Sequence, residues 1–291
     1  MAQDYLLAHL KKTGLLDLLA IKGGTAIRKL YAGNEGRFSL DLDFSTANIE
    51  QDHADVELAF LDTVDGLSLS PFSYRVSERR GKLMVEIESK FVSQSTLKTK
   101  LDFSAAPWLA PVQAAWVPMA IHKQYEFDLP TIGTIRLEEN IAEKIARLNR
   151  TTAARDMYDL AWMAKQAKIW AALDKDLIRR LAVLKMWVDA NGMHASSTTW
   201  EPAHEGHAFD PDRWLRRRAS SEFDIQDIGA LAVPTPKAEE LSDTVSHAFS
   251  FLRELDDEEK VLAAVNGRDR GTAIRLLESL PGGRLKGVGL Y

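Results

Sequence analysis

Residues 37–45 read RFSLDLDFS, and polar and apolar side chains alternate without a break from Phe38 to Ser45. This alternation is typical of a half-buried β-strand, because successive side chains of a strand point to opposite faces of the sheet. The polar face of the predicted strand carries Ser39, Asp41, Asp43 and Ser45. The opposite face carries Leu40, Leu42 and Phe44, which we expect to pack into a core.

Asp41 and Asp43 are therefore expected to share one face, with their Cα atoms about 7 Å apart. Two carboxylates at about 4 Å repel by roughly 4 kcal/mol at an effective dielectric of 20, so a fold that keeps both ionised usually supplies a cation. Ligands that are all oxygen favour Mg²⁺ or Mn²⁺. An isolated Asp-x-Asp pair more often lies on a solvated sheet face, so the surrounding sequence has to decide.

A glycine turn precedes this strand. Residues 21–31, IKGGTAIRKLY, predict a short strand ending at Lys22, a turn at Gly23-Gly24 and a helix from Thr25. Backbone N–H groups at such a helix start can approach phosphate oxygens, and the helix dipole favours the anion. Alone, the glycine pair fits an ordinary turn equally well. A phosphate cradle followed about seventeen residues later by a metal-binding strand is much more specific, because phosphoryl chemistry needs both together.

The remaining sequence predicts two parts. Three further strand-like runs, at 72–78, 82–91 and 96–104, place a mixed α/β domain at residues 1–136. Helical patterns dominate from Leu137, so residues 137–291 are expected to form a mostly helical domain, and the fold class is α+β. The chain has no cysteine and no apolar run of about 18 residues, which argues against disulfides and membrane spans. Without an export signal, we expect a cytoplasmic protein.

These motifs resemble those of the AbiEii/AbiGii toxins, which include the MenT toxins and belong to the polymerase-β-like nucleotidyltransferase superfamily. The resemblance rests on four motifs in order, covering roughly residues 15–165: Gly23-Gly24-Thr25, residues 37–43 (RFSLDLD), Ala142-Glu143-Lys144 and residues 155–160 (RDMYDL). It implies a polymerase-β-like N-terminal domain with a mixed sheet, followed by a second lobe. It also implies a toxin of a type IV toxin–antitoxin system that uses an NTP and Mg²⁺.

The resemblance further implies an acceptor and a partner. The acceptor would be the 3′ end of tRNA, which by analogy with the MenT toxins receives a pyrimidine nucleotide, so that aminoacylation and translation stop. The partner would be a cognate antitoxin, and one antitoxin type modifies a toxin serine that corresponds here to Ser39. We expect neither a membrane nor DNA as a partner. Outside the active site, Arg216–Arg218 is the strongest candidate for tRNA contact, although a solvated helix end explains this run better.

The catalytic residues expected on this basis are Asp41, Asp43, Asp102, Lys144 and Asp156. Asp41 and Asp43 would bind the metal, and Asp102 would complete the site and accept the proton of the acceptor hydroxyl. Asp102 matches the family position and ends a strand-like run. Glu86 and Glu88 are its competitors, because they too share one strand face.

The expected nucleotide-binding residues are Gly23, Gly24, Thr25, Arg37, Ser39 and Lys144, with Arg28 as a further candidate for phosphate contact. Lys144 would reach a triphosphate oxygen as a point charge. Asp156, favoured over Asp159, would orient Lys144 or the base. Without the family resemblance, a solvated helix face with a pair such as Asn140–Lys144 is the better reading.

Three functions remain open at this stage. The first is the toxin nucleotidyltransferase described above. The second is a nucleotidyltransferase that acts on a small molecule or a protein. The third is a degenerate module that binds a nucleotide without catalysis. Ser39, Asp41, Asp43 and Lys144 are all present, which favours an enzyme, because a degenerate copy would be expected to lose at least one carboxylate.

Overall fold

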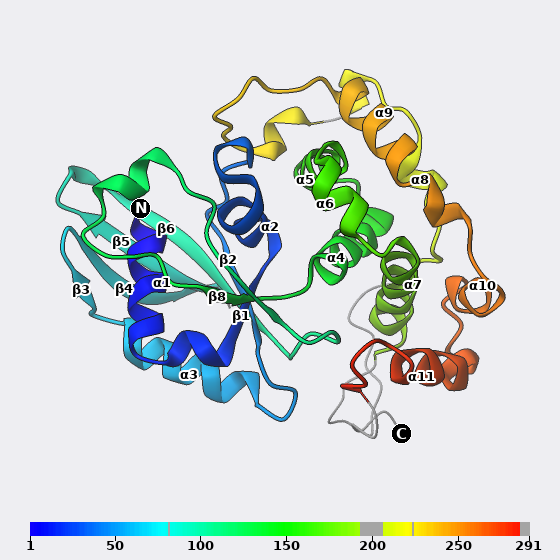
Figure 1. The fold of residues 1–291 in the computed structure, drawn as a ribbon, viewed down its shortest axis with the longest axis horizontal. Helices are drawn as coiled ribbons and strands as arrows, with labels where there is room; N and C mark the ends of the chain where they lie inside the picture. The colour runs from blue at the N-terminus through cyan, green and yellow to red at the C-terminus, as the bar shows by residue number, and fades with distance from the viewer. Residues whose placement is uncertain (81, 193–205, 223, 286–291) are drawn as a thin grey trace. The chain divides into compact units, whose positions relative to one another are not determined.

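The computed structural model describes residues 1–80, 82–192, 206–222 and 224–285. The chain forms two compact units, Met1–Ile135 and Arg136–Tyr291, which are considered separately below (Figure 1). Strands gather in the first unit and helices in the second, as expected of an α+β protein. Among the described residues, no helix combines the length and the apolar composition needed to cross a bilayer.

The first unit is built on an eight-stranded mixed sheet with the order β3-β4-β5-β6-β2-β1-β8-β7. Its strands are β1 (Leu19–Lys22), β2 (Leu42–Thr46), β3 (Ser68–Leu69), β4 (Phe72–Arg79), β5 (Lys82–Ser89), β6 (Val92–Ser104), β7 (Val112–Ala114) and β8 (Ile132–Thr134). Its helices are α1 (Ala2–Lys12), α2 (Gly23–Ile27) and α3 (His53–Val64), with short turns at Leu15–Leu18, Arg28–Ala32, Gly33–Glu35 and Ala120–Gln124. The strands predicted at 72–78, 82–91 and 96–104 correspond to β4, β5 and β6.

Alternation along β5 and β6 decides which sheet face is buried. Val85, Ile87 and Leu101 are at most 3% exposed and join one core with apolar residues of α1 and α3. Residues at even positions of β5 and β6 lie on the opposite face, because side chains alternate along a strand. That opposite face carries the charged residues of both strands, including Asp102.

The region predicted as a strand from Phe38 to Ser45 is shorter in the structure. Strand β2 begins at Leu42, and residues 37–41 form no regular element. Leu40 is 61% exposed, so its expected place in the core is wrong, whereas Leu42 and Phe44 are fully buried. The polar–apolar alternation starts at Phe38, but the residues paired with a neighbouring strand start only at Leu42, so the predicted strand is too long. Likewise, α2 begins at Gly23 rather than at Thr25.

A buried ionic cluster fixes the segment that follows α2. Asp4 of α1 is 1% exposed, forms an ion pair with Lys29 and accepts a hydrogen bond from the Tyr125 hydroxyl. Burial alone would raise the pKa of Asp4, but the charges of Lys29 and the N-terminus and the bonds to Lys29 and Tyr125 hold it at about 2. This cluster ties the turn Arg28–Ala32 to α1 and so supports the glycine segment beside it.

The second unit is helical in its described residues. Its helices are α4 (Leu137–Arg150), α5 (Ala154–Lys165), α6 (Ala167–Ala172), α7 (Lys175–Asn191), α8 (Asp212–Leu215), α9 (Ala238–Ala248), α10 (Asp257–Ala263) and α11 (Arg270–Glu278). Short turns lie at Ser220–Glu222, Ile225–Ile228, Ser250–Arg253 and Gly267–Asp269. The long α7 packs against α4, α10 and α11, and α5 packs against α9. Asp174 caps α7 by accepting a bond from the N–H of Leu177, which satisfies one otherwise unpaired donor.

Candidate active site

Strand pairing brings Asp43 and Asp102 together. β2 and β6 run parallel, with Asp43 directly beside Asp102 in the register, although the two residues are far apart in the sequence. On the other side of β2, antiparallel β1 places Lys22 beside Asp43. The three residues therefore form a row across the sheet, one residue from each strand.

Asp41 lies just before β2 and is held through its backbone. The Thr25 hydroxyl of α2 donates a hydrogen bond to the carbonyl oxygen of Asp41, and Thr25 is 1% exposed. The Gln3 amide donates to the carbonyl oxygen of Leu40 at 3.0 Å. These two bonds fix the irregular segment that precedes the strand, so that α2 and α1 together position Asp41.

Both glycines lie where a side chain would collide with a predicted site residue. Gly23 has φ +71°, and a Cβ there would lie 2.5 Å from Oδ2 of Asp43. A Cβ on Gly24 would lie 2.1 Å from Nη2 of Arg37. Glycine therefore lets the backbone approach the Asp43 carboxylate and the Arg37 guanidinium closely, which a phosphate cradle next to a metal site would need.

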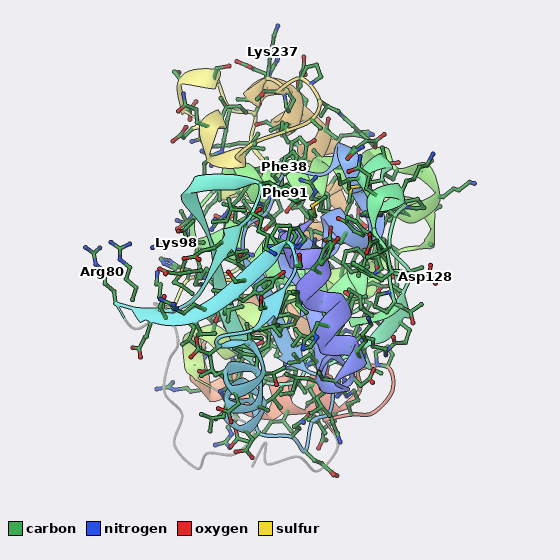
Figure 2. The ribbon with its side chains drawn as sticks, turned by 90° about the vertical axis from the view of Figure 1, so that its left-hand side faces the viewer. Phe38, Arg80, Phe91, Lys98, Asp128 and Lys237 are labelled. Atoms are coloured by element: carbon green, nitrogen blue, oxygen red, sulfur yellow. The ribbon has the colours of Figure 1, made fainter. Side chains whose placement is uncertain are left out.

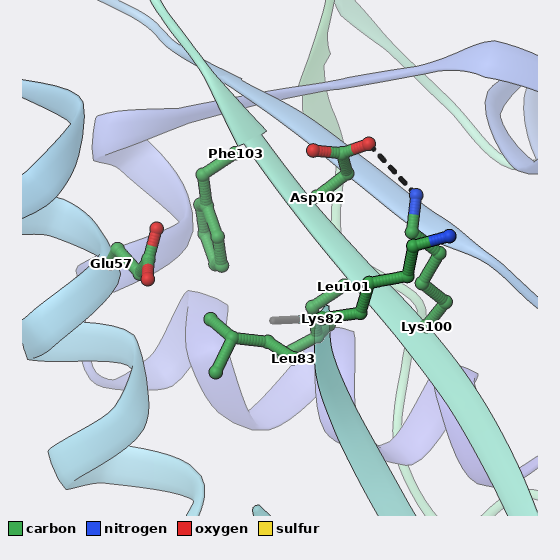
Figure 3. A pocket seen from close by; sticks show the side chains of 7 residues that line it. All are labelled: Glu57, Lys82, Leu83, Lys100, Leu101, Asp102 and Phe103. Carbon is green, nitrogen blue, oxygen red and sulfur yellow. Dashed lines mark hydrogen bonds and ion pairs between the residues drawn. The ribbon is translucent and has the colours of Figure 1, made fainter. Parts of the chain in front are cut away.

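Asp41, Asp43 and Asp102, called the aspartate cluster below, influence one another electrostatically. Burial raises the pKa of Asp43, and the charges of Asp41 and Asp102 raise it further, against the opposing effect of Lys22 and Lys100. The Lys100 ammonium pairs with the Asp102 carboxylate at 3.0 Å (Figure 3). The cluster thus holds more negative charge than its neighbours neutralise around Asp43.

The donor set of the aspartate cluster fits a hard divalent cation, because all its ligands are carboxylate oxygens. Within the described residues, however, no group of three or more His, Cys, Asp or Glu side chains has the arrangement that a metal ion needs. The carboxylates would have to turn toward a shared point. Asp102 would also have to accept the ion in addition to, or in place of, Lys100.

The other predicted residues of the first unit lie outside this row. The Arg28 guanidinium lies 3.5 Å from the centre of the Phe38 ring, and Phe38 is 46% exposed. Ser39 is half-buried in the irregular segment. Glu86, a competitor of Asp102, pairs with Lys98 at 2.8 Å on the far side of β6 from β2, and Glu88 is exposed on the same strand.

Lys144 and Asp156 belong to a buried charge group in the second unit. The Lys144 ammonium lies 3.0 Å from Oδ1 of Asp156 and 2.7 Å from Oδ2 of Asp159, and Arg147 Nε lies 3.0 Å from Oδ2 of Asp156. We call these four residues the lysine cluster. Lys144, Asp156 and Asp159 are each at most 2% exposed, so the solvated-face reading of Lys144 is wrong.

Charge pairing dominates in the lysine cluster. Burial alone would raise the pKa of Asp156, but the charges of Lys144 and Arg147 and the bond from Lys144 outweigh burial and lower it. Asp156 and Asp159 both contact Lys144, and the distance to Asp159 is the shorter one. The preference for Asp156 over Asp159 as the partner of Lys144 therefore has no support in these distances.

Sequence reasoning passed over two cations beside the aspartate cluster. Lys100 precedes Asp102 by two residues, so the period of a strand places both on one face, and this signal was available in the sequence. Lys22 was indistinguishable from ordinary surface charge, because its place beside Asp43 depends on which strands pair. Arg216 and Arg217 pair with Glu222 and Asp243, and Arg218 donates to the Thr152 hydroxyl.

Comparison with known proteins decides the family. The family model described as the nucleotidyl transferase AbiEii toxin of type IV toxin–antitoxin systems matches residues 5–250. The chain belongs to the AbiEii family. The resemblance inferred from the four sequence motifs is therefore confirmed, and the AbiEii protein is a nucleotidyltransferase and the toxin of a type IV system, which implies an antitoxin partner.

A solved structure supports the same conclusion. MenT4, a nucleotidyltransferase toxin from Mycobacterium tuberculosis, matches this AbiEii protein with a TM-score of 0.80 and 32% sequence identity, over 95% of this chain and 90% of MenT4. The predicted α+β fold class, with its mixed sheet and helical second part, is thereby confirmed. Among curated protein sequences, none matches the chain.

Proposed function

We propose that this AbiEii protein transfers a nucleoside monophosphate from an NTP, preferably a pyrimidine nucleotide, to the 3′ end of tRNA in the cytoplasm. The added nucleotide would block aminoacylation and so stop translation. The observation that carries the proposal is the row of Asp43 and Asp102 on neighbouring parallel strands, with Asp41 close by and Gly23 packed against the Asp43 carboxylate.

In this proposal the aspartate cluster binds Mg²⁺ or Mn²⁺, which would neutralise triphosphate charge during transfer. The N–H groups around Gly23, Gly24 and Thr25 bind phosphate oxygens, and Arg37 and Ser39 contact the same triphosphate. The terminal hydroxyl of the acceptor forms a new bond to the α-phosphorus, while the bond from that phosphorus to the bridging oxygen breaks and pyrophosphate leaves. Asp102 accepts the hydroxyl proton.

The lysine cluster has a supporting role in the proposal. Residues 1–136 form the domain that carries the transfer chemistry, and residues 137–291 form the helical domain. Lys144 contributes positive charge to nucleotide binding, and Asp156 holds its ammonium in place, because the two charges lie 3.0 Å apart and are buried. If this role is correct, Lys144→Arg should raise the KM for NTP while leaving the KM for tRNA unchanged. An unchanged KM for NTP in a folded Lys144→Arg protein would contradict it.

Incubation of the protein with each labelled NTP, Mg²⁺ and total tRNA tests the function. Label on the 3′ end of tRNA supports the proposal, and the NTP that reacts identifies the nucleotide. Asp41→Ala should lower transfer on the order of a thousandfold or more, because it removes several kcal/mol of transition-state stabilisation. Its fold should persist, since Asp41 is only partly buried. Label on a protein or a small molecule instead, or wild-type turnover by Asp41→Ala, would refute it.

Ser39 is the proposed site of regulation by an antitoxin that modifies the toxin. It lies in the irregular segment between Arg37 and Asp41 and is only half-buried, so a modifying enzyme could reach it. A phosphate there would add negative charge close to the aspartate cluster and would oppose NTP binding. Intact mass and peptide mapping after exposure to the cognate antitoxin check this; a modification found only at other residues would contradict it.

A further inference from the structure

One face of the β4–β6 ribbon carries an excess of cations. Side-chain alternation and the strand register place the even residues of β5 and β6 on the same face as the odd residues of β4. The cations of this face are Arg75, Arg79, Lys82, Lys98 and Lys100, which we call the cationic face. Its carboxylates are Glu86, Glu88 and Asp102. The excess is local, because the whole chain has a formal net charge of −5.

Three of these cations form no close ion pair within the described part of the chain. Lys98 lowers the pKa of Glu86 most, through its hydrogen bond and its charge, but the charges of Arg75 and Arg79 help to lower it, and Arg75 lies opposite Glu86 in the register. Lys98 pairs with Glu86 and Lys100 with Asp102. In contrast, Arg75, Arg79 and Lys82 form no hydrogen bond or ion pair through their side chains anywhere in residues 1–80, 82–192, 206–222 or 224–285. All three are exposed. The strongest basic run of the second unit differs, since Arg216 and Arg217 already pair with carboxylates.

The register places one pair of like charges against each other at the end of the ladder, whereas Arg75 lies opposite Glu86. Arg79 is directly opposite Lys82 at the end of the β4–β5 ladder, and Arg80 follows with φ +55°. Like charges directly opposite in a sheet are destabilising, and an external anion would relieve this repulsion. Figure 2 shows Arg80 and Lys98 projecting outward at the left-hand edge of the view.

The cationic face ends at the aspartate cluster. Met84 of β5 is opposite Lys100 of β6, so the antiparallel register continues toward Lys82 and Asp102. A cavity of about 310 Å³ lies at this point, and Lys82, Lys100, Asp102 and Phe103 are among the residues that line it. Figure 3 shows the Lys82 side chain pointing toward the Lys100–Asp102 pair. An anionic chain on this face would therefore lead to Asp102, on the strand beside Asp43.

We propose that the cationic face binds the sugar–phosphate backbone of the acceptor RNA and guides its 3′ end to Asp102; this inference rests on the function proposed above. An acidic antitoxin surface is the competing occupant. Protein interfaces usually have an apolar or aromatic centre. The large apolar side chains that are exposed among the described residues include Phe91 and Leu97, but Leu97 lies on the opposite sheet face and none belongs to the cationic face. The apolar side chain between these cations, Met84 opposite Lys100, is only half-exposed, so the exposed surface of the face is charged and suits phosphates better.

The test compares two double variants with the same change of charge. Arg79→Glu with Lys82→Glu removes two proposed phosphate contacts. Lys12→Glu with Lys123→Glu, at exposed positions of the same unit, is the control. We measure steady-state transfer to a tRNA transcript, and binding of that transcript by fluorescence anisotropy between 50 and 200 mM salt in the Asp41→Ala background. We also measure the melting temperature, to show that each variant folds.

The test variant should raise the KM for tRNA about tenfold or more and leave the KM for NTP unchanged. Its binding should also lose about one to two units of slope in a plot of log K against log salt. Equal RNA binding and equal KM in the test and control variants would overturn the inference. So would normal RNA kinetics combined with lost antitoxin binding, which would assign the face to the antitoxin.

The two proposals can fail separately. If the wild-type protein transfers no nucleotide to any tRNA, the proposed acceptor is wrong. If the wild-type protein modifies tRNA and the test variant behaves as the control does, only the cationic face is wrong. If the double charge reversal lowers stability, a single Arg75→Gln variant replaces it, because it adds no negative charge. Its KM for tRNA should rise in the same direction but by less.

Discussion

The aspartate cluster and the lysine cluster hold charges of the same kinds under opposite conditions. Around Asp43, burial and two neighbouring carboxylates raise the pKa, and the nearby cations only partly compensate. Around Asp156, the charges of Lys144, Arg147 and Arg155 lower the pKa in spite of burial. The negative charge of the first cluster is only partly neutralised by its neighbours, whereas the carboxylates of the second are paired with cations of the same unit. The difference indicates that the aspartate cluster can gain free energy by binding a cation, whereas the lysine cluster contributes to folding stability.

The largest effect on stability should come from removing the lysine of the buried cluster. Lys144→Met leaves Asp156 and Asp159 buried without their shared cation, which should cost about 3–5 kcal/mol of unfolding free energy. The matched change at the aspartate cluster, Lys100→Met, breaks a pair whose Asp102 side chain is 58% exposed and should cost about 1 kcal/mol or less. Urea denaturation of both variants measures the contrast. Similar losses for the two lysines would remove the distinction between the clusters.

Neutralising one aspartate in each cluster should change stability in opposite directions. At pH 7, Asp156→Asn should lose on the order of 2 kcal/mol, because the cations then lack one carboxylate. Asp43→Asn should be as stable as the wild type or more stable, because repulsion is removed. Because the proposed function assigns both residues to the reaction, each variant should also transfer less nucleotide than the wild type. Denaturation at pH 7 gives the signs, and a loss of stability in Asp43→Asn would contradict the unrelieved charge at that cluster.

Asp156 and Asp43 should also make stability depend on pH in opposite ways. The folded pKa of Asp156 is lowered, so its stabilisation is present above its unfolded pKa of about 3.9 and is lost as the pH falls through the folded value. The deficit of Asp156→Asn should therefore shrink below about pH 4. The folded pKa of Asp43 is raised, so its ionised form costs stability at neutral pH and this cost disappears as the pH falls. Denaturation curves from pH 7 to pH 3 follow both changes.

A substitution at Gly23 should lower transfer activity while leaving the protein folded. Gly23→Ala places a side chain at φ +71°, which costs about 1–2 kcal/mol, and puts a methyl group 2.5 Å from the Asp43 Oδ2 atom, well inside van der Waals contact. The carboxylate can turn aside, so the protein should fold, but transfer should fall about tenfold or more as Asp43 leaves its position. Gly66→Ala, also at positive φ but with nothing near its Cβ, is the control. Equal transfer activity in the two variants would show that Gly23 does not position Asp43 for the reaction.

The sequence was sufficient for elements whose side chains alternate against a partner strand. β4, β5 and β6 lie where alternation predicted them, and the family motifs led to the correct fold class. Alternation failed at Leu40, because a pattern does not show where pairing begins. The proximity of Asp43 and Asp102 depends on the order of the strands, which local patterns do not contain.

The lysine cluster shows a second limit. Helical periodicity puts Lys144 off the apolar stripe of α4, which is ordinarily a sign of exposure. In the structure Lys144 is buried because Asp156 and Asp159, from the next helix, supply its counterions. A single helix cannot reveal this, since the compensating charges come from another element. The motif resemblance identified the residue, but only the packed structure shows its surroundings.

The closeness of Gly24 to Arg37 has a consequence for how this protein can evolve. The guanidinium of Arg37 occupies the volume that any side chain at position 24 would need. A protein that keeps the arginine can replace glycine only if the guanidinium moves away from the turn, whereas one with a shorter residue 37 can vary residue 24 without that movement. Substitutions at positions 24 and 37 are therefore expected to be correlated, although twelve residues separate them.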